Sequence, residues 1–220
     1  MTTATLAPPT LGGAAPDRAQ YCLVLVHGRG GSATDIMGLG TALALPDLAL
    51  AAPQAPGQSW WPTSFLAPEA QMQPFVDHGL AAIEAAIAAL TERGLTRDRI
   101  ALAGFSQGGC LALEYTARRG EVTGAFGFSA GLVGTTDEGV PSDKLYGFAD
   151  KALHYDTDLT GVPVHISVHE RDPHIPLKRA QDSATALKKR GAETALTVIP
   201  GAGHGITQGD LKALHSHLTR

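Results

Sequence analysis

The sequence contains few cysteines and no large excess of charge of either sign. Only 2 of its 220 residues are cysteines, Cys22 and Cys110, which excludes a scaffold stapled by several disulfides and a cysteine-rich zinc module. The formal net charge is −4, so no global field attracts nucleic acid or an anionic membrane surface. We therefore expect a protein that has no nucleic-acid partner.

Long apolar runs and a leader segment are also lacking. No uninterrupted apolar stretch approaches the ~20 residues that a membrane-spanning helix requires. The longest candidate, residues 79–90, carries Glu84 in its middle. The first residues, MTTATLAPPTLGG, lack the basic start and the apolar core of a signal peptide. These absences predict a soluble protein of the cytoplasm without a membrane span.

The composition is that of a globular chain. Apolar residues make up 44% of the sequence, which is enough to bury one sizeable core and does not fit intrinsic disorder. Residues 1–20 are rich in Thr, Ala, Pro and Gly and are predicted to form an N-terminal tail or a short edge strand near Leu11. Residues 21–220 are predicted to form one domain.

Short apolar runs alternate with amphipathic segments along the predicted domain. The runs predict strands at residues 21–26, 48–52, 99–105, 123–129, 162–168 and 194–199. The amphipathic segments predict helices at residues 34–45, 80–90, 107–118, 180–190 and 208–218. This alternation implies an α/β fold with a mostly parallel sheet and helices on both faces. Two irregular segments, residues 53–75 and 131–160, are expected to form the rim of a site.

A G-x-S-x-G motif lies between one of these strands and the helix that follows it. It comprises residues 104–108, Gly-Phe-Ser-Gln-Gly, with Ser106 at its centre. In a strand–turn–helix setting such a motif forms a strained elbow that lifts the serine hydroxyl above the carboxyl edge of the sheet. Glycines are needed on both sides because a Cβ would clash in so tight a turn. Ser106 is therefore a candidate nucleophile, and an ordinary Gly/Ser turn is the alternative.

A nucleophilic serine needs a base to remove its proton and a carboxylate to orient that base. In this setting the chain order is serine, acid and histidine, each after its own strand. His204 follows strand 194–199 in a glycine-rich loop, and Asp172 follows strand 162–168. Asp172 has the best position among the acids, but others remain open, namely Asp150, Asp156, Asp158 and Glu170.

Two patterns suggest a cofactor, and neither is favoured. His165, His169, Asp172 and His174 could hold a metal, but no helical H-E-x-x-H motif or cysteine pair accompanies them. Residues 28–33 also satisfy the dinucleotide pattern G-x-G-x-x-A. That pattern requires a carboxylate at the end of the next strand, whereas Asp47, the acid at about the right distance, precedes strand 48–52. We expect neither a metal nor a cofactor.

Two further segments fit a hydrolytic site. The glycine-rich turn at residues 27–31, His-Gly-Arg-Gly-Gly, follows the first clear strand and can supply a backbone N–H to an oxyanion hole, with the N–H of Gln107 as the second donor. Bulky side chains in the turn-rich segment after residue 53 are predicted to form the wall of a substrate pocket. They are Trp60, Trp61, Phe65 and Leu66.

Together these segments resemble the phospholipase/carboxylesterase family of α/β-hydrolases, which includes the acyl-protein thioesterases. The resemblance is carried by LVHGRGGSATDI, APQAPGQSWWPTSFLAP, GFSQGGCLALEYTAR, RDPHIP and PGAGHGI. It implies an α/β-hydrolase fold without a large cap domain and with no cofactor. It also implies Ser106 as nucleophile, Asp172 as acid and His204 as base, with backbone donors at Arg29 and Gln107.

The expected function is hydrolysis of small carboxylic esters, short-chain or aryl, through a serine acyl-enzyme. A thioesterase or a lysophospholipase is the alternative on the same site, and a catalytically silent binding protein is the alternative of another class. Arg29 stands where many family members have an aliphatic residue, and the pair Trp60 and Trp61 is bulky. Acyl-protein or lysophospholipid substrates therefore do not follow from the resemblance. The sequence leaves open whether the protein is a homodimer.

Overall fold

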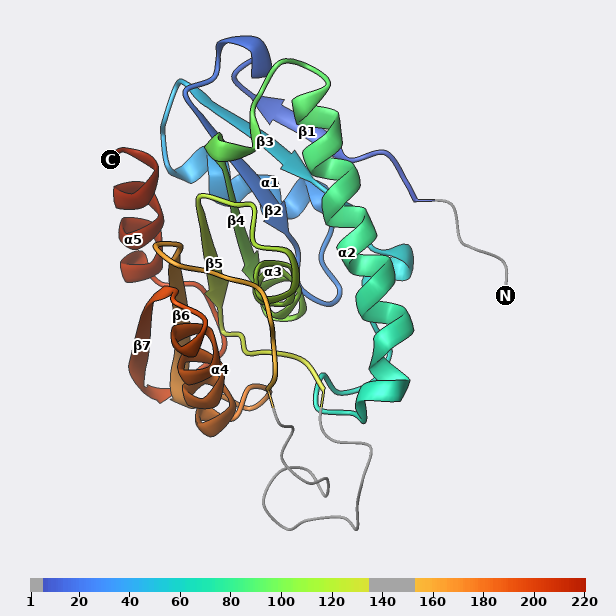
Figure 1. Ribbon diagram of the computed structural model, residues 1–220, viewed down its shortest axis with the longest axis vertical. Coiled ribbons are helices and arrows are strands. Elements are labelled where there is room, and N and C mark those ends of the chain that lie inside the picture. The colour runs from blue at the N-terminus through green and yellow to red at the C-terminus, as the bar shows by residue number, and fades with distance from the viewer. Residues whose placement is uncertain (1–5, 135–152) are drawn as a thin grey trace.

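The computed structural model describes residues 6–134 and 153–220 and shows one twisted sheet between two layers of helices (Figure 1). The sheet has 7 strands in the order β1-β3-β2-β4-β5-β6-β7. Strand β1 is antiparallel to β3, and every other neighbouring pair is parallel. The strands are β1 (Thr10–Gly13), β2 (Tyr21–Val26), β3 (Leu48–Ala52), β4 (Ile100–Phe105), β5 (Gly124–Phe128), β6 (Pro163–Arg171) and β7 (Glu193–Ala202).

Helices cover both faces of this sheet, as the sequence predicts. The helices are α1 (Ala33–Ala42), α2 (Glu69–Thr91), α3 (Gln107–Arg119), α4 (Leu177–Lys189) and α5 (Gln208–Leu218). Side chains of α2, α3 and α4 belong to the apolar core on one face, and those of α1 and α5 belong to the core on the other. The mostly parallel sheet, the helical layers and the order of the elements are those of an α/β-hydrolase, and the described residues include no large cap.

The central strands are apolar throughout because both of their faces are covered. In β2, Cys22, Val24 and Val26 face the core under α2 and α3, whereas Leu23 and Leu25 face the core under α1 and α5. All five side chains are buried. Successive side chains of β2 therefore alternate between the two apolar cores, and none of these five side chains faces solvent.

Helix α2 is longer than its sequence pattern predicts, which corrects part of the segment expected to be irregular. Residues 53–75 were expected to lack regular structure, but α2 begins at Glu69 and contains Pro74. A proline inside a helix removes one backbone hydrogen bond. Met72 and Val76 flank Pro74 and are almost fully buried against the core. The burial of these side chains offsets the lost hydrogen bond, and the helix continues through the proline.

Other boundaries differ less. Strands β6 and β7 run past their predicted ends because they continue to pair with each other, with a register shift between His169 and Arg171. At the N-terminal side, β1 contains Leu11 and pairs with β3 at the edge of the sheet. The division into a tail of residues 1–20 and a domain of residues 21–220 stays a prediction. Within the described ranges no helix is both long and apolar enough to cross a membrane.

The first turn of α3 lies directly against the end of β2. A Cβ added at Gly104 would lie 2.3 Å from the carbonyl oxygen of Gly108, and one added at Gly108 would lie 2.1 Å from the carbonyl oxygen of Val26. Both distances are far below van der Waals contact, and both neighbours are backbone atoms that cannot rotate away. The fold therefore requires glycine at both positions. The two close contacts hold the turn after β4 against the turn after β2.

We expect Gly108→Ala to destabilise the protein by at least ~3 kcal/mol, the upper range for overpacking, because its methyl group would overlap the β2 backbone. Gly38→Ala is the control, since Gly38 is exposed in α1 and a Cβ there meets no atom within 4 Å. Alanine favours a helix over glycine by about 1 kcal/mol, so Gly38→Ala should leave the stability equal or higher. Urea unfolding of both variants measures the difference. Equal stability of the two variants would contradict the close contact at Gly108.

Candidate active site

Ser106 lies at the sharp turn that joins β4 to α3. Its backbone has φ 54° and ψ −122°, a conformation that non-glycine residues rarely adopt and that costs about 1–3 kcal/mol. The turn is held by two backbone hydrogen bonds of 2.9 Å, from Ser106 N–H to the Phe128 carbonyl and from Cys110 N–H to the Ser106 carbonyl. The G-x-S-x-G motif thus has the strained elbow geometry that the sequence predicts, with the hydroxyl at the carboxyl edge of the sheet.

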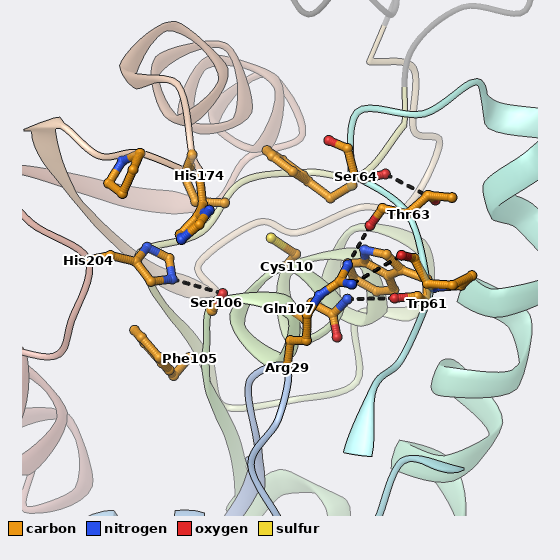
Figure 2. A pocket seen from close by; sticks show the side chains of 14 residues that line it. Arg29, Trp61, Thr63, Ser64, Phe105, Ser106, Gln107, Cys110, His174 and His204 are labelled. Carbon is orange, nitrogen blue, oxygen red and sulfur yellow. Dashed lines mark hydrogen bonds between the residues drawn. The ribbon is translucent and has the colours of Figure 1, made fainter. Parts of the chain in front are cut away.

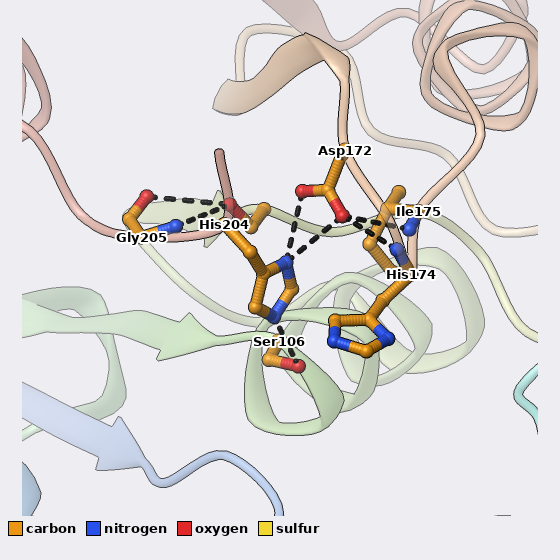
Figure 3. Close-up of polar contacts among 7 residues, drawn as sticks. Ser106, Asp172, His174, Ile175, His204 and Gly205 are labelled. Atoms are coloured by element: carbon orange, nitrogen blue, oxygen red, sulfur yellow. Dashed lines mark hydrogen bonds and ion pairs between the residues drawn. The ribbon is translucent and has the colours of Figure 1, made fainter. Parts of the chain in front are cut away.

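His204 lies beside this serine although 98 residues separate them in the chain (Figure 3). Its Nε2 is 2.9 Å from Ser106 Oγ, and its Nδ1 is 2.9 Å and 3.0 Å from the two carboxylate oxygens of Asp172. An ionised carboxylate only accepts hydrogen bonds, so Nδ1 carries the proton and the lone pair of Nε2 faces the serine hydroxyl. This tautomer can accept the serine proton.

The environment of Asp172 keeps its carboxylate ionised. Burial alone would raise the pKa of this fully buried side chain, but hydrogen bonds from the His204 ring and from the backbone N–H groups of His174 and Ile175 hold the pKa below its usual value. The two N–H groups donate to Oδ1 at 2.8 Å and 2.9 Å. The tight turn after β6 therefore fixes both the charge and the orientation of Asp172.

The rival acids have other positions. Glu170 accepts a hydrogen bond from the backbone N–H of Gly201, and Asp158 accepts from Thr160 on the surface. Asp150 lies outside the described residues, and no hydrogen bond joins Asp156 to His204. Among the described acids, Asp172 is the one bonded to the His204 ring.

The turn at residues 27–31 is fixed by a buried histidine. His27 Nδ1–H donates to the Gly28 carbonyl at 2.8 Å, and its Nε2 accepts from the backbone N–H of Ala55 at 3.1 Å. Burial lowers the pKa of His27, so the ring stays neutral in this role. Next in the turn, the backbone N–H of Arg29 makes no hydrogen bond to another described residue, and neither does that of Gln107 at the first position of α3. Both N–H groups remain available to an oxyanion.

A pocket of about 610 Å³ opens at Ser106 and His204 (Figure 2). This volume is in the usual range of small-molecule sites. Trp61 and Phe65 line the pocket as the sequence predicts, together with Arg29 and His174. Cys110 also lines it, but burial raises the pKa of its thiol to about 12, so it stays protonated and is a poor nucleophile.

Two residues expected in the pocket wall lie elsewhere, which corrects the prediction. Trp60 and Leu66 do not line the pocket, and their side chains are 3% and 0% exposed. The indole N–H of Trp60 donates to the carbonyl of His27 at 2.8 Å, and its ring packs on the His27 ring with centroids 5.1 Å apart. Trp60 therefore supports the turn at residues 27–31 from the core side, and Leu66 is part of the apolar core.

The Gln107 side chain is a feature that sequence reasoning missed, because only its backbone N–H was considered. Gln107 Oε1 accepts hydrogen bonds from the backbone N–H of Trp60 at 3.0 Å and from the Ser59 hydroxyl at 3.3 Å. Gln107 Nε2 donates to the Trp61 carbonyl at 2.9 Å. The side chain thus joins the elbow to the pocket wall. No motif signals this contact, since it links segments 46 to 48 residues apart.

His174 is a second residue whose place the sequence did not indicate. Its ring lies edge-on to the His204 ring, with centroids 4.8 Å apart and an interplanar angle of 79°. Because His174 follows Asp172 by two residues, the turn that presents the acid also seats this ring beside the histidine. The metal-site alternative gains no support in the described parts of the chain, where no three His, Cys, Asp or Glu residues could hold an ion. His165 instead lies 3.2 Å from Asp210.

Comparison with known proteins places this geometry in a family. The sequence pattern that defines the Phospholipase/Carboxylesterase family matches residues 14–220. A phospholipase/carboxylesterase from Dyadobacter fermentans, known from a crystal structure, is 35% identical, with 100% of this chain and 99% of that chain covered and a TM-score of 0.84. No curated protein matches this chain.

Two more distant crystal structures share the fold. Esterase PE8 is 24% identical, with 98% of this chain and 99% of that chain covered and a TM-score of 0.73. A carboxylesterase from Mesorhizobium loti is 22% identical, with 100% of this chain and 97% of that chain covered and a TM-score of 0.70.

We expect Gln107→Ala to lower the free energy of unfolding by about 1–3 kcal/mol, since it leaves the buried N–H of Trp60 without its acceptor. The matched control is Gln181→Ala, because Gln181 is exposed on α4 and its side chain makes no hydrogen bond to a described residue. Urea unfolding gives the two free energies, and Trp fluorescence reports the environment of Trp60 and Trp61. If both alanine variants unfold alike, the Gln107 side chain does not hold the loop.

Proposed function

The chain belongs to the phospholipase/carboxylesterase family of α/β-hydrolases, and on that premise we propose that it hydrolyses carboxylic esters through a serine acyl-enzyme. The observation that carries the proposal is the bridge made by His204, whose two ring nitrogens lie within 3.0 Å of Ser106 and Asp172. The bridge opens onto a pocket of substrate size. A serine, a neutral histidine and an ionised carboxylate in this order are the components of nucleophilic acyl transfer.

In the proposed mechanism, His204 Nε2 removes the proton of Ser106 as Oγ attacks the ester carbonyl carbon. The carbonyl oxygen becomes an oxyanion, and the backbone N–H groups of Arg29 and Gln107 donate hydrogen bonds to it. The tetrahedral intermediate collapses, the bond to the alcohol oxygen breaks, and protonated His204 gives its proton to that oxygen. Asp172 stabilises the imidazolium of His204 from the moment it takes the serine proton until it gives that proton to the alcohol oxygen.

Deacylation repeats these steps with water in place of the serine hydroxyl. His204 removes a proton from the water, which attacks the acyl carbon, and the proton returns to Ser106 Oγ as the acyl–serine bond breaks. The products are the carboxylic acid and the free enzyme. Each proton moves between His204 and an oxygen atom, so the cycle requires no metal or cofactor.

The proposed substrates are short-chain or aryl esters of small alcohols. The support is that Trp61 and Phe65, two large side chains, line the same pocket as Ser106. Thioesters and lysophospholipids would react by the same chemistry and are the alternatives that direct assays separate. A catalytically silent binding protein would keep the fold and the pocket but not the reactive serine.

The first test is covalent labelling and activity of matched serine variants. We expect a fluorophosphonate probe to label the natural protein and Ser216→Ala, where an exposed serine of α5 is removed, but not Ser106→Ala. We expect Ser106→Ala and His204→Ala to lose ester hydrolysis by orders of magnitude, and Asp172→Asn to lose about 10⁴-fold in kcat because it leaves the wrong histidine tautomer. Circular dichroism should show folded variants. Labelling of a folded Ser106→Ala, or an unreactive natural protein, refutes the proposal.

The second test is the acyl-chain preference. With p-nitrophenyl esters of increasing chain length, kcat/KM should be highest for short acyl groups, because Trp61 and Phe65 limit the space beside Ser106. Trp61→Phe and Trp61→Ala should shift the optimum stepwise toward longer chains. Phe126→Leu is the control, since Phe126 is a buried aromatic residue of β5 that does not line the pocket. A natural protein that prefers long-chain esters contradicts this preference.

A further inference from the structure

Arg29 places a positive charge at the wall of the pocket. The residue belongs to the turn after β2, and its exposed side chain reaches across to the loop that carries Trp61 (Figure 2). There Nη1 donates to the carbonyl of Pro62 at 3.1 Å and Nη2 donates to the carbonyl of Thr63. These two bonds hold the guanidinium at a fixed position beside the cavity.

Within residues 6–134 and 153–220, no carboxylate pairs with this charge. The residues that line the pocket in the described chain include neither aspartate nor glutamate, and Arg29 makes no ion pair with a described residue. Asp172 lies behind His204 with a fully buried side chain. A guanidinium is always protonated and has five N–H donors, of which the two carbonyls use two. No described residue bonds to the remaining donors, so these donors and the charge can bind an anion in the pocket.

The proposed mechanism indicates on which half of the ester such an anion would lie. In Figure 2, Ser106 lies between His204 on one side and Arg29 on the other. His204 gives its proton to the leaving oxygen, so the alcohol half of the ester lies on the side of His204. The acyl half then extends from Ser106 toward Arg29 and the loop at Pro62 and Thr63.

We propose that Arg29 binds a carboxylate at the far end of the acyl group, so that the preferred substrates are monoesters of dicarboxylic acids. This inference rests on the ester hydrolysis proposed above and adds its substrate class. The guanidinium fork fits a carboxylate through paired charge-assisted hydrogen bonds, which are stronger than neutral ones. The protein as a whole carries a net charge of −4, so the attraction comes from this local charge.

The competing explanation is that Arg29 only fastens the loop through its two carbonyl bonds. A fastening residue alters the pocket for every ester alike. A carboxylate-binding residue instead changes the ratio of kcat/KM for an anionic ester to that for its neutral counterpart. The ratio is therefore the measurement that separates the two roles, whatever Arg29 variants do to the absolute rates.

The experiment compares the p-nitrophenyl monoester of adipic acid with p-nitrophenyl methyl adipate, which differs only in the masked carboxylate. We expect the natural protein to favour the anionic ester and Arg29→Met to lower the anionic-to-neutral ratio by about 10-fold or more, the loss for a hydrogen bond to a charged group. Arg29→Lys should retain part of the ratio. Arg93→Met is the matched control, since it removes an exposed arginine of the same carbonyl-bonded kind after α2, and it should leave the ratio unchanged.

Added salt should lower the ratio in the natural protein and not in Arg29→Met, because screening weakens only the charge interaction.

A second ester pair, p-acetoxybenzoate and its methyl ester, places the carboxylate on the alcohol half of the substrate. An Arg29-dependent preference for p-acetoxybenzoate would overturn the assignment to the acyl half, and a ratio near one that Arg29→Met leaves unchanged would reduce Arg29 to a fastening role. Failure of the hydrolase proposal is distinct, because neither ester would then be cleaved and Ser106 would not be labelled.

Discussion

The contact between the first turn of α3 and the end of β2 is the constraint on which the candidate site depends. It exists because Gly108 has no Cβ, so its backbone can approach that of Val26 within a distance that no side chain permits. Gly104 likewise lets the end of β4 approach the backbone of Gly108. The contact brings the turn after β2 beside the turn after β4. As a result, the N–H groups of Arg29 and Gln107 and the hydroxyl of Ser106 all lie at one edge of the sheet. The strain at Ser106 is sustained because the elements on both sides of it are fixed by the core.

A buried polar network then attaches the irregular segment before α2 to these two turns. His27 and Trp60 tie it to the first turn, and the side chain of Gln107 ties it to the second. An incomplete network destabilises the fold, because a buried donor or acceptor without a partner loses its hydrogen bond to water and gains none in the protein. Apart from the short 3-10 helix Pro56–Gln58, the segment contains no helix or strand, so these hydrogen bonds position Trp61.

The parts of this structure that follow from local sequence patterns were predictable, and the parts that depend on contacts across the chain were not. The strands β2 and β3 match their predicted bounds because a buried central strand is a continuous apolar run. The positions of Ser106, Asp172 and His204 after β4, β6 and β7 were predictable because parallel strands end at one edge. By contrast, the start of α2 at Glu69 was missed. The prolines and glycines of residues 53–75 favour irregular structure locally, whereas the burial of Met72 and Val76 depends on contacts with the core.

The error over Trp60 has the same origin. A tryptophan in a turn-rich segment fits a pocket wall as well as a core, and only its bond to the His27 carbonyl decides between them. The role of the Gln107 side chain was equally invisible, because a backbone role explained the motif without it. Sequence patterns thus located the reacting groups, whose order along the chain is fixed by topology. They did not locate the residues that hold the pocket, whose partners are set by packing.

Two arginines near the loop of residues 62–65, Arg179 of α4 and Arg29 of the turn after β2, show how burial decides what a charge can bind. The Arg179 side chain is 1% exposed, donates to the carbonyls of Leu132 and Gly134, and lies 6.0 Å from the ring centroid of Phe65. These carbonyl dipoles and the aromatic ring stabilise the buried charge. Arg29 contacts the same loop at Pro62 and Thr63, but from the open side of the pocket. The buried charge of Arg179 stabilises the pocket wall. The charge of Arg29 faces the cavity, where an anionic group of a substrate can reach it.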